Sequence, residues 1–238
     1  MCDIIESTGG AHMDANRNKV REMSIARTME RLRKNNMEAA FLPSAQDVVP
    51  MLRSMLEENC TIALGGSMTL VESGALKLVK SDTYRLIDRY EQGLSPEELR
   101  ARFIEAFSAD VFLSSVNAIT EHGELYCVDG TSNRVGALLF GPKKVIIIAG
   151  WQKIVPSLRD AVDRVKRISA PANAIRLEKD TPCVKSGHCV APFCDDRNLM
   201  AIPTGACDTG ICSNMIVMGR QPRNGRVSVL IVGEELGY

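Results

Sequence analysis

The chain has 238 residues, of which 45% are hydrophobic and 24% charged, as in an ordinary globular protein rather than a disordered one. Its 29 Lys and Arg balance its 29 Asp and Glu, so no basic field is expected to hold a nucleic acid. The longest apolar runs are too short to span a bilayer, and the polar N-terminus lacks a signal-peptide core. We therefore expect a cytoplasmic protein without nucleic-acid or membrane partners. The length fits one domain, which we expect over residues 14–238, after a flexible extension over residues 1–13.

Helices and strands are predicted to alternate through the first half of the chain. An amphipathic helix is predicted over 16–34, where apolar residues recur at helical spacing. Ser44 is a plausible N-cap for a helix over 45–58, because its hydroxyl can accept a bond from a free backbone N–H. A further helix follows Thr69 and ends near Val79. The strands predicted here are short apolar runs and cover residues 37–42, 60–64 and 84–88.

The same alternation continues in the second half. Ser95, Pro96 and Glu98 form a strong helix start, with a cap, a first-turn proline and a capping-box glutamate. Helices are predicted from there to about Phe107, and over residues 131–140 and 155–168. Strands are predicted over residues 110–116, 125–128 and 144–149. Strands separated by helices predict an α/β fold, a mostly parallel open sheet with helices on both faces.

The last fifty or so residues break this rhythm. After Pro182 the composition turns to Cys, Gly, Pro and Asp, which predicts an irregular cysteine-rich segment over 182–213. Strands are predicted over 214–218 and 226–232, on either side of the turn sequence Gln221–Gly225. Because its Asn-Gly pair is a strong turn signal, we expect the chain to close with a β-hairpin.

A glycine-rich turn follows the strand over 60–64 and is the first candidate site. Gly65 and Gly66 allow a close approach of the backbone to a ligand, and the N–H groups of a helix start attract an anion. Ser67 and Thr69 add hydroxyl donors. The sequence is neither a Walker loop nor a complete dinucleotide fingerprint, and a tight turn without a ligand is the plain alternative.

Small polar and charged residues follow two further predicted strands and form the second candidate. Since ligands of open α/β sheets bind at the carboxyl ends of strands, we expect a ligand site here. Arg134 falls in the first turn of a predicted helix, where it needs a ligand anion or a carboxylate partner. Asp129 could instead cap that helix. The predicted ligand-binding residues of this segment are Asn117, Asp129, Asn133 and Arg134, and the predicted catalytic residue is Glu121.

Cysteines form the third candidate, a metal site in the cysteine-rich segment. Five of the eight cysteines lie within thirty residues: Cys183, Cys189, Cys194, Cys207 and Cys212. In a reducing compartment such a group is more often metal-binding or redox-active than disulfide-bonded. Four thiolates would complete an iron-sulfur or zinc site, although the common Cys-x2-Cys spacing is absent. The sequence predicts an iron-sulfur cluster, with zinc or no metal as alternatives.

Several of these segments, in this order, resemble the LUD (lactate utilization) domain family. They are Gly65–Thr69, the run NAITEHGELY from Asn117, the run VDGTSNRV from Val128 and the run FGPKKVI from Phe140. The cysteine-rich segment and the ending GEELGY resemble the cysteine-bearing, stand-alone branch of that family. One departure is a stretch over 191–208 that interrupts what looks like a compact Cys-x2-Cys segment and brings Cys194 and Cys207.

The resemblance implies the superfold of ribose-phosphate isomerases, glucosamine-phosphate deaminases and CoA transferases. It also implies a role in the oxidation of L-lactate to pyruvate, beside iron-sulfur partner proteins. Our leading hypothesis is an accessory or redox protein of organic-acid metabolism that binds a small anionic ligand. One alternative is an enzyme of acyl, CoA-transfer or sugar-phosphate chemistry that uses Glu121, and another is a structural partner subunit; the sequence leaves a homo-oligomer open.

Overall fold

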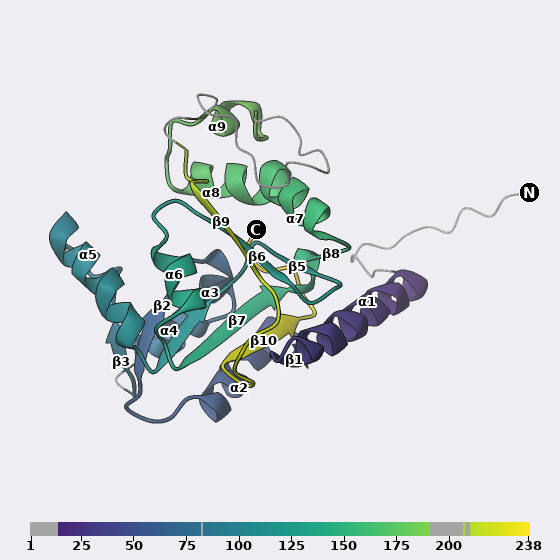
Figure 1. The fold of residues 1–238 in the computed structure, drawn as a ribbon, viewed down its shortest axis with the longest axis horizontal. Helices are drawn as coiled ribbons and strands as arrows, with labels where there is room; N and C mark the ends of the chain where they lie inside the picture. Colours follow the sequence, from purple (N-terminus) through teal and green to yellow (C-terminus); the bar gives the residue numbers. More distant parts are fainter. Residues whose placement is uncertain (1–13, 82, 191–206, 208–209) are drawn as a thin grey trace, which may run out of the picture.

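A six-stranded parallel sheet forms the centre of the computed structural model, which describes residues 14–81, 83–190, 207 and 210–238 (Figure 1). Every neighbouring pair in this sheet is parallel. In spatial order its strands are β1 (Glu38–Leu42), β10 (Val227–Val232), β7 (Lys144–Gly150), β4 (Val111–Ser114), β2 (Thr61–Leu64) and β3 (Arg85–Ile87). The predicted mostly parallel sheet is therefore confirmed.

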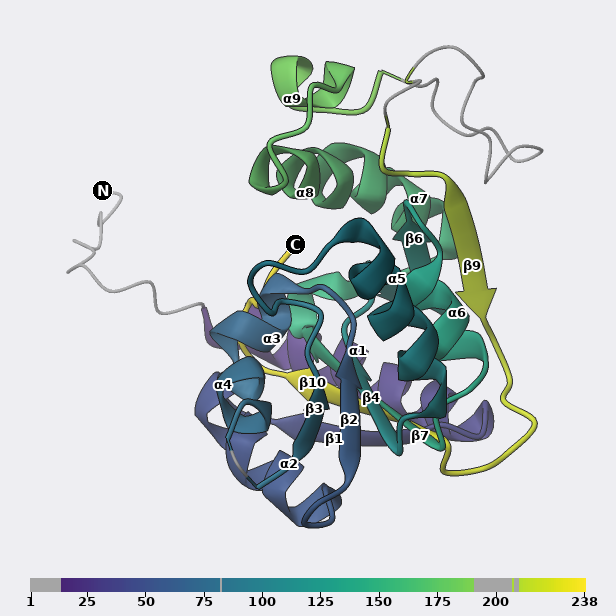
Figure 2. The same ribbon diagram turned by 90° about the vertical axis from the view of Figure 1, so that its left-hand side faces the viewer.

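Helices cover both faces of this sheet, as predicted (Figures 1 and 2). The central strand β7 shows why: Val145 and Ile147 belong to one apolar core, and Ile146 and Ile148 to the other. A strand buried on both faces must be apolar throughout. One core includes residues of α1 (Ala15–Lys34) and α6 (Asn133–Leu139), and the other residues of α2 (Val48–Met55), α3 (Met68–Glu72) and α4 (Ala75–Val79).

A second, four-stranded sheet lies beside the first. Its strands are β8 (Ile154–Val155), β5 (Ala118–Thr120), β6 (Leu125–Asp129) and β9 (Asn214–Met218). A helical layer packs on it through a separate apolar cluster that includes Tyr126 of β6 and Val162 of α7. This layer consists of α7 (Leu158–Arg164), a π-helical turn η4 (Val165–Ser169) and α8 (Ala170–Arg176), with α9 (Pro182–Ser186) beyond it (Figure 1).

The predicted closing hairpin is wrong, although both of its strands exist. The strand β9 pairs antiparallel with β6, whereas β10 lies parallel between β1 and β7 in the other sheet. Every residue of β10 is buried, which suits an interior parallel strand. Gly225 does turn the chain, with φ of +76°, but it lies in a connection between two sheets.

Two predicted helices differ from the observed ones for local reasons. The helix after Thr69 is split into α3 and α4 at Gly74, whose φ of +73° interrupts it. Val155 belongs to β8, and α7 starts only after the cap residue Ser157. The helical layer then continues through α8, where Pro171 removes a backbone donor and the preceding turn widens into the π conformation.

The predicted helix starts at Ser44 and Ser95 are confirmed. Both residues form capping boxes, Ser44 before the 3₁₀ turn η1 (Ala45–Asp47) that leads into α2, and Ser95 before α5 (Pro96–Glu105), which runs into the 3₁₀ turn η2 (Ala106–Ser108). A 3₁₀ turn η3 (Trp151–Lys153) follows β7. Within the described ranges, no helix is both long and apolar enough to cross a membrane.

Candidate functional site

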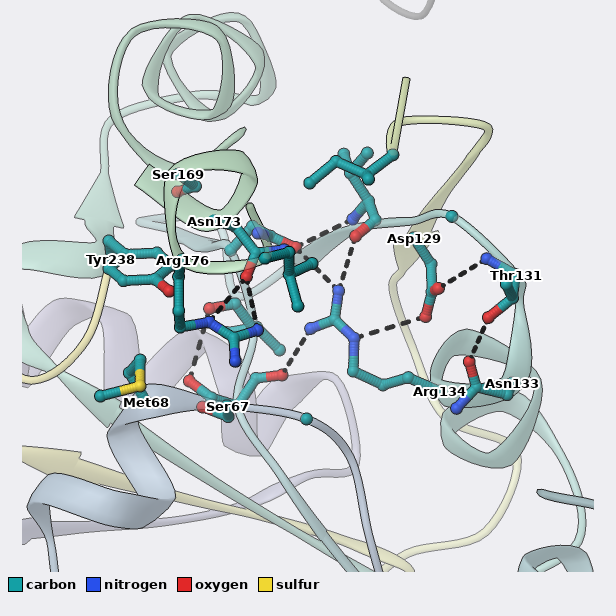
Figure 3. Close-up of a pocket in the computed structure, with 18 of the residues that line it drawn as sticks. Ser67, Met68, Asp129, Thr131, Asn133, Arg134, Ser169, Asn173, Arg176 and Tyr238 are labelled. Carbon is teal, nitrogen blue, oxygen red and sulfur yellow. Dashed lines mark hydrogen bonds and ion pairs between the residues drawn. The ribbon is translucent and has the colours of Figure 1, made fainter. Parts of the chain in front are cut away.

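A pocket of about 550 Å³ opens where the loops after β2, β4, β6 and β7 come together. All four loops leave the carboxyl ends of their strands, which is where open α/β sheets bind ligands. The two predicted segments, distant in sequence, share this pocket: Figure 3 shows Ser67 facing Arg134 across it. The predicted ligand-binding residues that line it are Gly66, Ser67, Thr69, Asn117, Asp129, Asn133 and Arg134.

Gly65 lies beneath the pocket rather than in its lining. A Cβ added there would overlap Ser114 Oγ and lie only 3.0 Å from Cγ of Arg134. The absence of a side chain thus lets Arg134 pack against the loop. A Cβ on Gly66, by contrast, would lie 3.4 Å from the hydroxyl of Tyr90, an ordinary contact.

This contrast gives a matched pair of variants. Gly65→Ala is expected to displace Arg134 and to lower the free energy of unfolding by about 1–3 kcal/mol, the usual cost of overpacking. Gly66→Ala is expected to change it by less than about 0.5 kcal/mol. Urea denaturation of the two variants measures the difference, and equal losses would contradict the role assigned to Gly65.

Asp129 caps α6 and pairs with Arg134. One of its carboxylate oxygens accepts bonds from the backbone N–H groups of Thr131 (3.1 Å) and Ser132 (3.3 Å), and the other accepts from Val135 (3.3 Å). The same carboxylate lies 3.5 Å from Nε of Arg134. Asp129 is thus both the helix cap and the carboxylate partner that the sequence indicated.

Arg134 fastens the ends of two strands together. Its guanidinium donates to the carbonyl oxygens of Ser115 (3.1 Å) and Val128 (2.6 Å) and to Oδ1 of Asn117 (3.1 Å). These bonds use most of its donors. Arg134 therefore contributes mainly position and positive charge to the pocket, which leaves other cations to contact a ligand.

Four further cations line the pocket and were missed from the sequence: Arg89, Lys153, Arg176 and Lys179. Among the described residues of the lining, Asp129 is the only one with an acidic side chain. The pocket thus carries a net positive charge, although the whole chain is neutral. Lys153 could have been recognised from the sequence by its position, three residues after the end of the most apolar strand.

Lys153 is almost fully buried, with 2% of its surface exposed. Its Nζ donates to Thr69 Oγ1 (2.9 Å) and to Ser115 Oγ (3.0 Å). Burial lowers the pKa of Lys153, the positive charges of Arg164 and Arg134 act in the same direction, and together these effects bring it to about 7. Near neutral pH a substantial fraction of this amine is therefore uncharged.

Two buried arginines add to the field around the pocket. Arg164 donates to the carbonyl oxygen of Asn117 (2.8 Å) and to Ser169 Oγ (2.7 Å), and burial lowers its pKa to about 10. Burial also lowers the pKa of Arg89, whose guanidinium lies 4.7 Å from the ring centroid of Phe103. Arg89 has no carboxylate partner among the described residues, so its charge remains available to an anion.

Arg176 and Tyr238 face Arg134 from the opposite wall (Figure 3). Arg176 donates to Asn173 Oδ1 through Nε (3.2 Å) and Nη2 (2.8 Å), which orients the guanidinium. Burial raises the pKa of the Tyr238 hydroxyl, and the charge of Arg176 partly offsets this rise. This wall therefore offers an arginine and a neutral hydroxyl as donors.

Glu121 lies elsewhere, in a second hollow beside α1. Its carboxylate accepts from Ser24 Oγ (2.5 Å) and pairs with Arg27 (3.1 Å), and these bonds lower its pKa. The antiparallel turn between β5 and β6 carries Glu121 away from the pocket. The structure therefore does not bring the predicted catalytic residue together with the predicted ligand-binding residues.

The family model for the LUD domain matches residues 25–232, a span that includes both pocket-lining segments. The chain belongs to the LUD domain family. This family is related to lactate utilization. No protein of curated function matches the chain.

Three solved structures that are similar to this LUD domain share between 14% and 20% of its sequence. A DUF162 family protein from Deinococcus radiodurans is 16% identical, with 90% of this chain and 98% of that chain covered and a TM-score of 0.49. The beta subunit of eIF2B from Chaetomium thermophilum is 14% identical, over 48% of this chain and 43% of its own, with a TM-score of 0.34. The delta subunit is 20% identical, over 47% and 48%, with a TM-score of 0.33. Because both the sequence identities and the TM-scores are low, these similarities support no conclusion about the ligand or the activity of this chain.

The cysteine-rich segment of this LUD domain is only partly described. Burial is the main reason why the pKa of the Cys212 thiol is raised to about 12. The charges of three nearby cysteines add to this effect: Cys189, Cys183 and Cys207. The described residues nevertheless hold no set of three Cys, His, Asp or Glu side chains placed to bind a metal ion. Cys194, the fifth predicted ligand, lies outside the described residues.

Proposed function

We propose that this LUD domain binds a small organic-acid anion in the pocket between Gly66–Thr69 and Asn117–Arg134, and acts as an accessory or redox protein in the metabolism of L-lactate and pyruvate. The observation that carries this proposal is the charge of the lining. Among the described residues of the lining, five side chains are basic and one is acidic: Arg89, Arg134, Lys153, Arg176 and Lys179 against Asp129.

Burial strengthens part of this field. The side chain of Arg134 is 13% exposed and Lys153 is 2% exposed, so water screens the charge of Arg134, and of Lys153 when it is protonated, poorly. An anion that enters the pocket replaces the missing counter-charge and gains charge-assisted hydrogen bonds. Lys153 and Arg89 have no carboxylate partner among the described residues, and burying a cation without one costs stability, which is a reason to expect an anionic ligand here.

The pocket also has an apolar side. Leu99 and Phe103 of α5, with Leu177 after α8 and Val116 after β4, lie among its lining residues. An inorganic anion alone would leave these apolar side chains in contact with water, whereas the carbon skeleton of an organic acid can cover them. The mixture of cations and apolar side chains thus favours an organic anion.

Isothermal titration with lactate, pyruvate and inorganic phosphate tests the proposal. Wild-type protein is expected to bind at least one of the two organic acids more tightly than phosphate. Arg176→Ala is expected to weaken that binding at least about tenfold, because one charge-assisted contact contributes about 1.5–3 kcal/mol. Arg53→Gln, an exposed charge change on α2, which contributes no residue to the pocket lining, is the matched control and is expected to bind as wild type.

Two results would contradict the proposal. One is the absence of heat and of a thermal shift with all three anions. The other is equal weakening by Arg176→Ala and Arg53→Gln, which would show a general effect of protein charge rather than a contact in the pocket.

Iron-sulfur partner proteins and a metal in the cysteine-rich segment complete the proposal, and both stay predictions. Protein purified without oxygen is expected to contain iron or zinc near one site per chain, with a broad visible absorbance if the metal is an iron-sulfur cluster. Cys212→Ser is expected to lower the metal content. Protein free of metal, with every thiol of the segment titratable, would contradict this part and leave the anion pocket untouched.

A further inference from the structure

We infer that Lys153 is a nucleophilic amine and that the pocket takes 2-oxo acids, which it holds as an imine between Lys153 Nζ and the carbonyl carbon. This inference rests on the proposed function, because it names the ligand class of the same pocket. It goes beyond anion binding because it assigns a covalent step to Lys153. Binding of an anion alone would not require such a step.

The placement of Lys153 supports this role. Its Nζ lines the pocket between two hydroxyls, Thr69 Oγ1 at 2.9 Å and Ser115 Oγ at 3.0 Å. The backbone around Gly237 covers it from one side, since a Cβ there would lie 3.4 Å from Nζ. No carboxylate of the described residues forms an ion pair with Lys153, so the amine is positioned by neutral partners that do not hold a proton on it.

The shared contact of Lys153 and Arg134 with Ser115 indicates the ligand class. Lys153 Nζ donates to Ser115 Oγ, and Arg134 Nη1 donates to the Ser115 carbonyl oxygen at 3.1 Å. The amine and the positive charge of Arg134 thus lie on either side of one residue. A 2-oxo acid carries its carboxylate and carbonyl on adjacent carbons, so a carboxylate attracted by this charge presents its carbonyl carbon to the amine.

The groups facing Lys153 keep part of it in the neutral, reactive form near pH 7. Its pKa is lowered to about 7 by burial and by the charges of Arg164 and Arg134, and Glu72 and Cys127 act in the opposite direction. Lysines that form imines in enzymes are activated in this way, by desolvation or by a neighbouring cation.

The proposed step balances without an oxidant or a reductant. The lone pair of Nζ forms an N–C bond to the carbonyl carbon, and the C=O π electrons pass to oxygen, which takes a proton from the nitrogen. The carbinolamine then takes one proton from solvent, its C–O bond breaks, and water leaves. The product is a protonated imine whose positive charge is next to the carboxylate.

Reductive trapping of the whole protein tests this inference. With pyruvate and sodium cyanoborohydride, we expect covalent addition of one carboxyethyl group per chain, located on Lys153 by peptide mass spectrometry. With lactate, which has the same carboxylate but no carbonyl, we expect none. Lys153→Met is expected to abolish the adduct, whereas Lys77→Met, a change at an exposed lysine of α4, is expected to leave it unchanged. Circular dichroism checks that both variants fold.

The outcomes separate the inference from the proposed function. Pyruvate that binds by calorimetry but leaves no adduct on Lys153, or adducts spread equally over surface lysines, would overturn the inference and keep the anion pocket. Lactate or phosphate that binds while pyruvate does not would also overturn it. If none of the anions binds, the proposed function and the inference about Lys153 both fail.

Discussion

Asp129→Asn is expected to make the protein less stable and, at the same time, a tighter binder of organic anions. The two effects have opposite signs because the carboxylate has two roles. It stabilises the fold through the cap of α6 and the ion pair with Arg134, and it is the one acidic side chain among the described residues of a lining with five basic ones.

The loss of stability follows from the burial of the pair. The side chains of Asp129 and Arg134 are 10% and 13% exposed, so Arg134 would keep a poorly solvated charge without its partner. Asparagine retains an acceptor for the backbone N–H groups of Thr131 and Ser132 but not both carboxylate oxygens. We expect the free energy of unfolding to fall by about 1–3 kcal/mol.

The gain in affinity follows from Coulomb's law. Removing a negative charge about 8 Å from a bound anion relieves about 2 kcal/mol of repulsion at an effective dielectric constant of about 20, or about thirtyfold in affinity. Added salt should reduce this gain.

Urea denaturation and calorimetry of the same sample measure both effects. Asp163→Asn, which removes a half-exposed carboxylate of α7 that pairs with Arg167 of η4, is the control and should change neither quantity appreciably. If Asp129→Asn weakened both stability and binding, Asp129 would be a ligand-positioning residue and the charge account of the pocket would be wrong.

Local sequence signals predicted most of the elements because those signals act over a few residues. The capping boxes at Ser44 and Ser95 and the continuous apolar run of β7 are examples in which neighbouring residues alone determine the outcome. The placement of the ligand segments was also predictable, since the carboxyl ends of parallel strands converge at one edge.

Pairing between distant strands could not be predicted in the same way. The Asn-Gly turn indicated a hairpin, yet β10 gains more by inserting between β1 and β7, where all its side chains are buried. A turn signal reports only the local backbone, whereas strand partners depend on apolar surface elsewhere in the chain.

The missed site residues have the same cause. Arg176 and Lys179 come from a helical layer whose π turn breaks the regular apolar spacing, and Tyr238 comes from the far end of the printed sequence. Glu121 shows the reverse error, because a residue next in sequence to a strand end points to α1 instead. Motif position thus predicted the backbone of the site better than its charged side chains.

Lys153→Met is expected to stabilise the protein near neutral pH and to lose this advantage as the pH rises. The folded-state pKa of Lys153 is about 7, below its ordinary value of 10.5. Between these two values the unfolded chain holds a proton that the folded chain has released. The stability of wild-type protein therefore rises with pH in this window, and the cost of burying Lys153 is fully present below about pH 7.

The magnitude follows from the size of the shift. Each pH unit within the window corresponds to about 1.4 kcal/mol, and the full shift to at most about 5 kcal/mol. Methionine fills much of the same volume without a charge, at the cost of the bonds to Thr69 and Ser115. Urea denaturation of wild type and variant at about pH 7 and about pH 9 should show the difference in unfolding free energy shrinking by about 2–3 kcal/mol.

Other groups titrate in this range, but they are the same in both proteins and cancel in the difference. Lys77→Met supplies the control, because an exposed lysine of α4 should give a difference that does not change with pH. A difference for Lys153→Met that is equally flat would mean that the folded protein keeps this lysine charged. The amine would then lack the free electron pair that imine formation requires, and the two Lys153 experiments would fail together.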